Sequence, residues 1–305
     1  MLLNTLWGCT SRSYLTCWIA IELNLLIFLP IIALGTRGRG PIITVKYIII
    51  QRVSGLIILL IILTSVHRSG SEVIKLILSI IFILKMGGFP FIHWAILIGA
   101  AVDWVALTII LTIQKVLPLL MMSNLVYHNL QPLCILSWIT LPLLAIKFLE
   151  LKIVVIISST FNLIAMFSVY CLTDHKWLEL LVLYIISTVP IMFMRGIVNL
   201  KNSGAKSVNR KLACGLGVLI LLRMIGIPPL PGFFFKLEVL RLRIIAGRYF
   251  LRTSFILGVS GILIAYLGLT VKNFVTYPRI SINAVSIRAS LLAVSGFSLS
   301  LLLVI

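Results

Sequence analysis

Four ionisable side chains lie inside long apolar stretches of this sequence, where a charged group is costly. Glu22 occurs in WIAIELNLLIFLP, Lys85 in FILKMGGFPF, Lys115 in TIQKVLPLL and Lys236 in PGFFFKLEVL. Charged residues at bilayer depth are rare, and those that occur commonly mark ion pathways or proton relays. The four residues therefore indicate proton or cation movement through a membrane.

Two opposing effects suit a buried lysine to this chemistry. Burial disfavours the charged amine, whereas a nearby carboxylate favours it. An amine held between the two influences can accept and release a proton at working pH. Any single lysine could instead extend to the membrane surface or form a structural pair. Four such groups together, two of them beside helix breaks, favour proton transfer.

Helix-breaking residues follow Lys85 and precede Lys236. The first set, in GGFPF at 87–91, is Gly87, Gly88 and Pro90; the second, in GIPPLPGFF at 226–234, is Gly226, Pro228, Pro229, Pro231 and Gly232. Glycine and proline weaken or break a helix interior. Lipid cannot satisfy the backbone groups that a break exposes, so each break must face protein or a water-filled cavity. Two breaks in corresponding places of two halves indicate an inverted repeat.

A proline also lies close to Lys115. Pro118 cannot donate a hydrogen bond to the carbonyl four residues earlier, which belongs to Gln114. We therefore expect the helix to be loosened one residue before Lys115, so that water can reach the amine.

The elements that carry these residues are apolar runs of membrane-spanning length. A helix that crosses a bilayer needs about 20 residues. We predict an all-α polytopic membrane protein with about ten transmembrane spans, at 14–34, 42–66, 72–100, 104–126, 129–147, 151–171, 177–199, 211–245, 249–275 and 286–305. The run 211–245 alone would make a helix of about 50 Å, against a hydrocarbon core of about 30 Å. The break at 226–234 is needed to fit it.

Composition supports the membrane class. The chain is 61% hydrophobic and only 11% charged, with a mean hydropathy of +1.20, whereas soluble domains carry about 25% charged residues. The net charge of +19 would suggest a nucleic-acid partner in a soluble protein. Here most basic residues flank the apolar runs, where they set membrane topology. We therefore predict no nucleic-acid binding.

Motifs for cofactors are absent from the sequence. There is no GxGxxG, P-loop or CxxCH, and the 5 cysteines are scattered without metal-ligand spacing. We predict that this chain binds no nucleotide, flavin, haem, iron–sulfur cluster or metal.

The chain resembles the NADH dehydrogenase subunit 2 family, which are antiporter-like subunits of mitochondrial respiratory complex I. The resemblance rests on five strings in order and spacing: WIAIELNLLIFLPII at 18–32, KYIIIQRVSG at 46–55, LKMGGFPFIHW at 84–94, QKVLPL at 114–119 and GIPPLPGFFFK at 226–236. Each string is short and weak by itself, but five in series are specific.

The resemblance implies a proton pathway along the membrane midplane. The family's glutamate falls on Glu22, its paired lysine on Lys85, its central lysine on Lys115 and its exit-side lysine on Lys236. In this interpretation the break KMGGFPF lets Lys85 meet water and pair with Glu22.

Further polar residues are candidates for the relay or for a half-channel feeding it. They are His93, Ser158, Ser159 and Asn162. The sequence departs from the family at two of them: the histidine expected directly after PF is displaced to His93, and Asn162 stands where a histidine is common. His93 could extend the relay or simply lie at a helix terminus.

The resemblance also implies a fold of two inverted five-helix repeats. The first would cover 1–126, with its opening helix missing or vestigial, because only 21 residues precede Glu22. The second would cover 127–275, and 276–305 would add a C-terminal transmembrane helix.

The implied function is that of a proton-translocating subunit of NADH:ubiquinone oxidoreductase in the mitochondrial inner membrane. NAD, FMN, iron–sulfur clusters and ubiquinone would be bound by partner subunits, and no redox chemistry would occur in this chain. The implied partners are other membrane-arm subunits, including neighbouring antiporter-like subunits, and phospholipids such as cardiolipin. Two alternatives stay open: a stand-alone cation/proton antiporter, and a scaffold subunit that conducts no protons.

Overall fold

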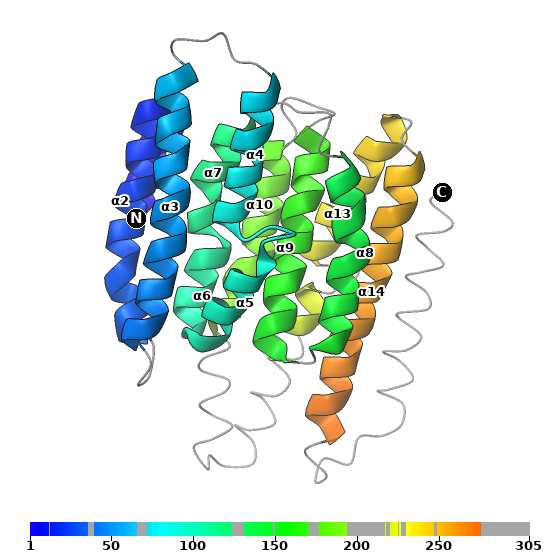
Figure 1. The fold of residues 1–305 in the computed structure, drawn as a ribbon. Coiled ribbons are helices and arrows are strands. Elements are labelled where there is room, and N and C mark those ends of the chain that lie inside the picture. Colours follow the sequence, from blue (N-terminus) through cyan, green and yellow to red (C-terminus); the bar gives the residue numbers. More distant parts are fainter. Residues whose placement is uncertain are drawn as a thin grey trace.

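The structure is a computed structural model in which helices stand side by side in one bundle (Figure 1). It describes residues 1–11, 13–35, 40–65, 72–123, 131–148, 150–170, 177–193, 217, 220–224, 226, 230–246 and 249–275. Within these ranges every regular element is a helix, which confirms the all-α prediction. A helix satisfies its own peptide groups, as a membrane-spanning segment must.

The first half of the bundle contains seven of these helices. They are α1 (Leu2–Thr10), α2 (Tyr14–Gly35), α3 (Gly40–Ser65), α4 (Glu72–Met86), α5 (Ile92–Ala101), α6 (Trp104–Leu111) and α7 (Ile113–Ser123). The second half contains α8 (Gln131–Lys147), α9 (Leu151–Tyr170), α10 (Trp177–Thr188), the 3-10 helix η2 (Val189–Phe193), α13 (Pro231–Ile245) and α14 (Tyr249–Val275).

Among the residues that the structure describes, five helical stretches are long and apolar enough to cross a membrane. They are Tyr14–Gly35, Pro41–Thr64, Trp104–Met122, Leu151–Val169 and Leu251–Thr270. Each coincides with a predicted span. The predicted tenth span, 286–305, lies outside the described residues.

The N-terminal segment forms a short helix. Its residues form α1, which packs against α2 and α7. Nine residues make a helix of only about 14 Å, too short to cross the bilayer. A helix of this length fits the expectation of a vestigial opening helix.

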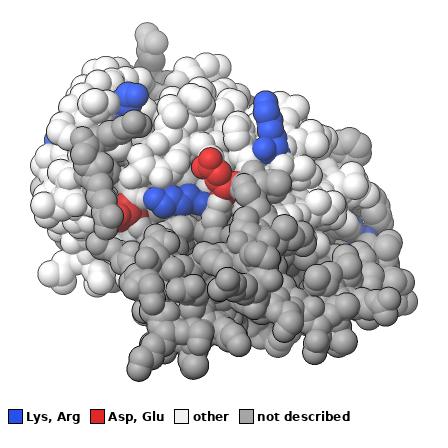
Figure 2. Space-filling model, turned by 90° about the horizontal axis from the view of Figure 1, so that it is seen from below, with Lys and Arg blue, Asp and Glu red and all other residues white. Residues whose placement is uncertain are grey.

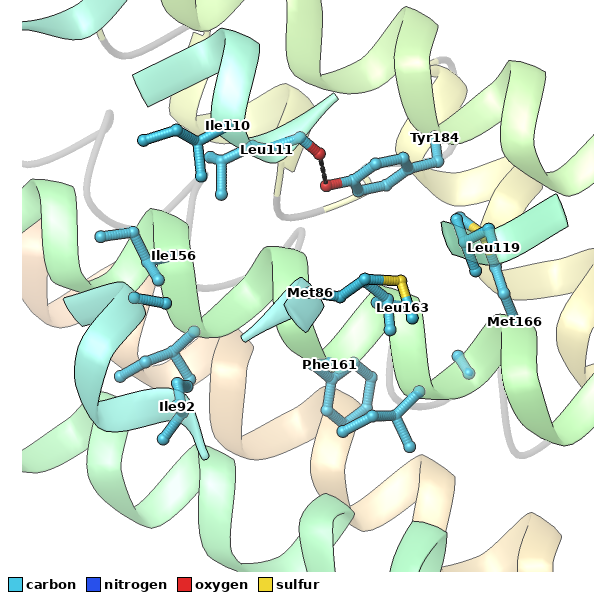
Figure 3. Close-up of a cluster of buried hydrophobic side chains, with 14 of the residues drawn as sticks. Met86, Ile92, Ile110, Leu111, Leu119, Ile156, Phe161, Leu163, Met166 and Tyr184 are labelled. Carbon is cyan, nitrogen blue, oxygen red and sulfur yellow. Dashed lines mark hydrogen bonds between the residues drawn. The ribbon is translucent and has the colours of Figure 1, made fainter. Parts of the chain in front are cut away.

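Helix α9 forms the centre of the bundle. Nearly all of its side chains are buried. Helices α3 and α8 lie on either side of α9 (Figure 1) and expose many apolar side chains. Figure 3 shows apolar side chains of the surrounding helices converging on α9, among them Met86, Ile92 and Ile110 beside Ile156 and Phe161. One end of the bundle carries neighbouring acidic and basic side chains (Figure 2).

The predicted break at 87–91 is confirmed, and paired glycines form it. Gly87 has a φ of +69°; its N–H donates to the carbonyl of Leu84 at 3.1 Å, and the N–H of Gly88 donates to the carbonyl of Ile83 at 2.8 Å. These two bonds form a Schellman motif, which caps the last carbonyls of α4. The helix restarts at Ile92.

The second break is shorter than predicted. Gly226 has a φ of +83° and its N–H donates to the carbonyl of Leu222 at 3.2 Å, which is the single-bond αL cap. Helix α13 begins at Pro231, so Pro231 and Gly232 are helical rather than part of the break. Proline is favoured at the first position of a helix because its missing N–H has no partner there anyway. Pro228 and Pro229 lie outside the described residues.

The cap at Gly87 gives the first testable prediction. We expect Gly87→Ala to destabilise the chain by about 1–3 kcal/mol, because an L-residue is strained at positive φ and the new methyl group overpacks its surroundings. The added Cβ would lie 2.7 Å from Cβ of Ala95 and 3.1 Å from Trp94. Thermal unfolding of the chain in its native membrane assembly measures the effect. Gly35→Ala is the control, because its Cβ would meet nothing closer than 3.6 Å; equal stability of the two variants would contradict the prediction.

Candidate functional site: a series of buried charges

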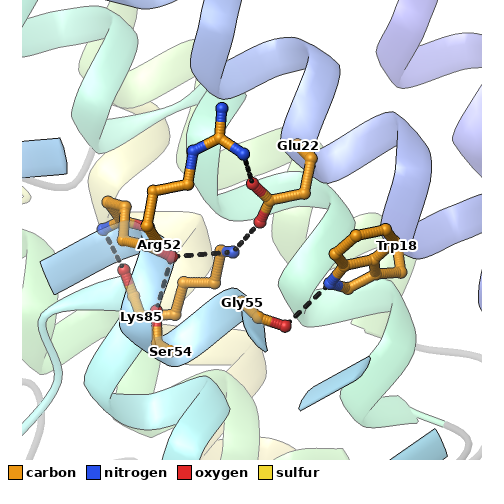
Figure 4. A network of polar contacts seen from close by, with 7 residues as sticks. Trp18, Glu22, Arg52, Ser54, Gly55 and Lys85 are labelled. Carbon is orange, nitrogen blue, oxygen red and sulfur yellow. Dashed lines mark hydrogen bonds and ion pairs between the residues drawn. The ribbon is translucent and has the colours of Figure 1, made fainter. Parts of the chain in front are cut away.

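Glu22 and Lys85 form a buried ion pair between α2 and α4. Nζ of Lys85 donates to Oε1 of Glu22 at 3.1 Å and to the backbone carbonyl of Gln51 at 3.4 Å. Both charged residues are buried, and Figure 4 shows the amine between the two acceptors. The carboxylate and the lysine that sequence reasoning associated are therefore in direct contact.

The break after Lys85 is satisfied by side chains of two neighbouring helices. The side-chain amide of Gln51 on α3 donates to the carbonyl of Lys85 at 2.9 Å. The indole N–H of Trp94 on α5 donates to the carbonyl of Leu84 at 2.9 Å. A helix end leaves its last carbonyls without the usual donor four residues on, and the Leu84 carbonyl here accepts from both Gly87 and Trp94. The break therefore ties the end of α4, and with it Lys85, to α3 and α5.

Arg52 is a second cation on Glu22 that sequence reasoning missed. Nη1 of Arg52 lies 3.2 Å from Oε2 of Glu22, and 42% of the arginine side chain is exposed. Oε2 nevertheless has no hydrogen bond of acceptable geometry within the described part of the chain. Arg52 lies at the middle of the predicted span 42–66, so the signal that identified the lysines was also present here.

Gly55 makes room for the carboxylate. A methyl group at this position would overlap Oε1 of Glu22 and lie 3.2 Å from Nζ of Lys85. The carbonyl of Gly55 also accepts a hydrogen bond from the indole of Trp18 at 2.8 Å (Figure 4). Close approach of α2 and α3 at this glycine therefore lets the ion pair form.

The helix before Lys115 is interrupted, but not where Pro118 led us to expect. Pro118 lies inside α7, and the interruption is at Thr112, which has φ −112° and ψ −82°. The N–H of Lys115 donates to the carbonyl of Thr112 at 3.0 Å instead of that of Leu111, four residues back. The hydroxyl of Tyr184 donates to the freed Leu111 carbonyl at 2.6 Å (Figure 3). A donor from α10 thus replaces the lost helical bond.

The amine of Lys115 reaches from the first half of the bundle to the second. Lys115 is buried on α7, which packs against α2 and α4. Its Nζ donates to the hydroxyl of Ser159 on α9 at 3.1 Å. One predicted relay residue therefore contacts one predicted half-channel residue.

The other half-channel candidates are also buried on α9. The hydroxyl of Ser158 lies 2.7 Å from the hydroxyl of Tyr266 on α14, and Asn162 is buried one turn further along α9. Tyr184 and Tyr266 were missed, because nothing in the sequence distinguishes them from interfacial tyrosines. Together with the serines they line α9 with hydroxyl groups.

Lys236 and His93 have different surroundings. Lys236 is buried on α13, five residues after the proline that begins this helix. The side chain of His93 is exposed on α5. His93 therefore does not lie among the buried charges of the bundle.

Arg243 is a fourth buried cation, which the sequence did not single out. Its guanidinium lies between the rings of Trp138 and Phe255, with centroids 4.0 and 4.2 Å from Cζ. Nη2 donates to the hydroxyl of Ser168 at 2.5 Å. Cation–π contacts of this kind are strongest when desolvated. Arg243 is on the same face of α13 as Lys236, seven residues further along.

Metal-binding clusters are not a feature of this site. In the ranges that the structure covers, no group of three or more His, Cys, Asp or Glu side chains could hold a metal ion. The chemistry available to these residues is acid–base exchange at amine, carboxylate and hydroxyl groups.

Comparison with solved structures identifies the fold. The chain superimposes on a chain of the respiratory complex I from Thermus thermophilus with bound Aureothin, with a TM-score of 0.71 and 18% identity, covering 88% of this chain and 67% of that chain. The bundle is therefore that of a polytopic helical membrane protein with the fold of a complex I chain.

Comparison with the sequences of known proteins finds similar chains. No family model matches the chain. NADH-ubiquinone oxidoreductase chain 2 of Artemia franciscana is 28% identical over 78% of this chain and 76% of its own length. The protein of that name from Patiria pectinifera is 24% identical over 98% of this chain and 89% of its own length. The chain is thus similar to proteins named NADH-ubiquinone oxidoreductase chain 2, and the resemblance predicted from the sequence is confirmed.

The packing at Gly55 gives the second prediction. We expect Gly55→Ala to displace the carboxylate of Glu22 and to separate it from Lys85 by more than 4 Å in a structure of the variant. Overpacking at a buried site should also cost about 1–3 kcal/mol of stability, although alanine favours a helix more than glycine does. Val53→Ala, at an exposed position of the same helix, is the control. An intact Glu22–Lys85 contact in the Gly55→Ala variant would show that the glycine is not required.

Proposed function

We propose that the chain is a membrane-arm subunit of NADH:ubiquinone oxidoreductase, complex I, in the mitochondrial inner membrane, and that it moves protons along Glu22, Lys85, Lys115 and Lys236. The observation that carries the proposal is the buried Glu22–Lys85 pair beside a helix break, at 3.1 Å, in a chain whose relatives bear that enzyme's name.

The first half would load and release a proton at Lys85. The amine has a carboxylate and a backbone carbonyl as acceptors, so both its charged and its neutral form have partners at hand. A lysine changes protonation state when its surroundings change, whereas an arginine does not. Movement of Glu22 toward or away from Lys85 would therefore favour uptake or release of the proton.

Lys115 would pass protons between the two halves. Its amine contacts the hydroxyl of Ser159, and a hydroxyl can donate and accept at once. The interruption at Thr112 places the lysine next to irregular backbone rather than in a continuous helix. The second half would then continue through the hydroxyl groups around α9 to Lys236, with Asn162 as a polar group of the half-channel.

Redox chemistry would belong to other subunits. They would bind NAD, FMN, iron–sulfur clusters and ubiquinone, and neighbouring antiporter-like subunits and phospholipids such as cardiolipin would cover the sides of this bundle. The predicted repeats 1–126 and 127–275 and the C-terminal helix 276–305 belong to the same proposal.

One observation favours a second candidate, a scaffold subunit that conducts no protons. Arg52 lies 3.2 Å from Glu22, and a guanidinium stays charged at any working pH. A permanent cation on the relay's carboxylate would suit a structural pair as well as a conducting one. The two candidates make opposite predictions for Lys115.

Variants of Lys115 give the third prediction. Lys115→Met keeps most of the side-chain volume and deletes the titratable amine, and Lys115→Arg keeps the charge but scarcely releases a proton. We expect both variants to assemble and both to lose at least about tenfold in proton translocation, in line with loss of one acid–base group. The measurement is NADH-driven proton translocation in sealed vesicles, normalised to assembled complex.

Lys147, an exposed lysine at the end of α8, supplies the control, and its Met and Arg variants should pump like the parent. On the scaffold hypothesis Lys115→Arg would behave like the parent and Lys115→Met would be neutral or mildly stabilising. Parent-like pumping by Lys115→Arg would thus rule out proton release by Lys115. Purification of the active chain without any redox partner would instead favour a stand-alone antiporter.

A further inference from the structure

Arg52 holds a charge at the middle of a membrane helix and on its outer side. It is the thirteenth residue of α3, which has 26 residues, so it lies about 18 Å from either end of the helix. Long cationic side chains reach the membrane surface from positions near helix ends. Arg52 is too deep for this, yet 42% of its side chain is exposed.

The surroundings of Arg52 on this side are apolar. Ile49 and Leu56, one turn before and after it on α3, are exposed, as are Leu23 and Leu26 on α2. We call these four residues and Arg52 the Arg52 face. A guanidinium in such a setting is stable only if something polar covers it, because lipid chains offer no acceptor.

Glu22 cannot satisfy Arg52 by itself. Its one negative charge is shared with Lys85, at 3.1 Å on the other carboxylate oxygen. The contact with Arg52, at 3.2 Å, lacks hydrogen-bond geometry at Oε2. A guanidinium has five N–H donors. Among the described residues, no side chain or carbonyl other than Glu22 contacts the guanidinium of Arg52. Glu22, Lys85 and Arg52 together therefore leave an excess positive charge on Arg52, which faces outward.

Two occupants are excluded by charge and depth. Lipid phosphates lie at the membrane surface, about 15 Å from the midplane, and cannot reach the guanidinium. A second copy of this chain, packed by two-fold symmetry, would place Arg52 against Arg52, because the face's own carboxylate is buried and already shared.

We propose that the Arg52 face is an interface with a transmembrane helix of a different polypeptide, which places a carboxylate near mid-membrane against Arg52. The inference deepens the proposed function and rests on it for the existence of neighbouring subunits. A carboxylate at this point would draw Arg52 away from Glu22 and leave Glu22 to Lys85. The partner would thereby control the first ion pair of the relay.

The partner is identified by photocrosslinking in the assembled complex. A benzophenone amino acid replaces Ile49 or Leu56, and mass spectrometry locates the crosslinked peptide. We expect a transmembrane helix of another polypeptide with an Asp or Glu near its centre. Crosslinks to lipid only, to a second copy of this chain, or to a helix without a carboxylate would each overturn the proposal.

Charge reversal gives the fourth prediction and tests the contact itself. Arg52→Glu should lower the yield of assembled complex roughly tenfold or more, because like charges would meet in the interface, and Arg52→Lys should retain most of it. Replacing the partner's carboxylate by arginine in the Arg52→Glu background should restore the yield to within about twofold of the parent. Arg241→Glu, at an exposed arginine of α13, controls for charge reversal as such. Failure of the double reversal to restore assembly would refute the contact.

The inference and the proposed function can fail separately. If the crosslinked helix carries a carboxylate but the assembly has no NADH dehydrogenase activity, the interface is supported and the proposed function is refuted. If the chain co-purifies with that activity but crosslinks at the Arg52 face to lipid only, the function is supported and the interface is refuted.

Discussion

Lipid offers no hydrogen-bond partner to a peptide group, and this chain nevertheless interrupts its helices inside the bundle. Each interruption must therefore be satisfied by protein. The Leu111 carbonyl accepts from Tyr184, and the Lys85 carbonyl accepts from Gln51. Gln51 contacts Lys85 twice, since its own backbone carbonyl accepts from the lysine amine. Gln51 therefore both satisfies the break after Lys85 and accepts a hydrogen bond from the lysine amine, so one residue fixes the position of Lys85.

The buried charges are unequal in number, and the protein stabilises the excess cations in different ways. Lys85 and Arg52 share Glu22, Lys115 donates to a serine, and Arg243 lies between two aromatic rings. Removing one partner of a buried ion pair commonly costs about 3–5 kcal/mol of stability, so loss of Glu22 would destabilise the fold unless a cation released its proton. A buried amine can lose its charge by releasing a proton, whereas a guanidinium cannot. The buried lysines could therefore change charge during function, and the arginines could not.

The sequence predicted the features that depend on local rules and missed those that depend on packing. Charge within an apolar run revealed Lys85 and Lys115, and paired glycines predicted the break at Gly87, because both signals are written in consecutive residues. The interruption at Thr112 was misplaced because Pro118 can lie in a helix whose freed carbonyl finds another donor, and no local rule names that donor. Arg52 was overlooked although it carried the same signal as the lysines. The aromatic rings around Arg243 come from α8 and α14, and such long-range contacts leave no trace in the spacing of one element.

The central claim is that the Glu22 carboxylate governs proton transfer at Lys85. The direct test is the number of protons translocated per NADH oxidised by complex that contains Glu22→Gln. The matched control is Glu238→Gln, which alters a partly exposed pair with Arg241 at 3.8 Å. Glutamine is nearly isosteric, so both complexes should assemble. The account predicts a lower proton yield per NADH for Glu22→Gln and an unchanged yield for Glu238→Gln. A parent-like proton yield from fully assembled Glu22→Gln complex would contradict it.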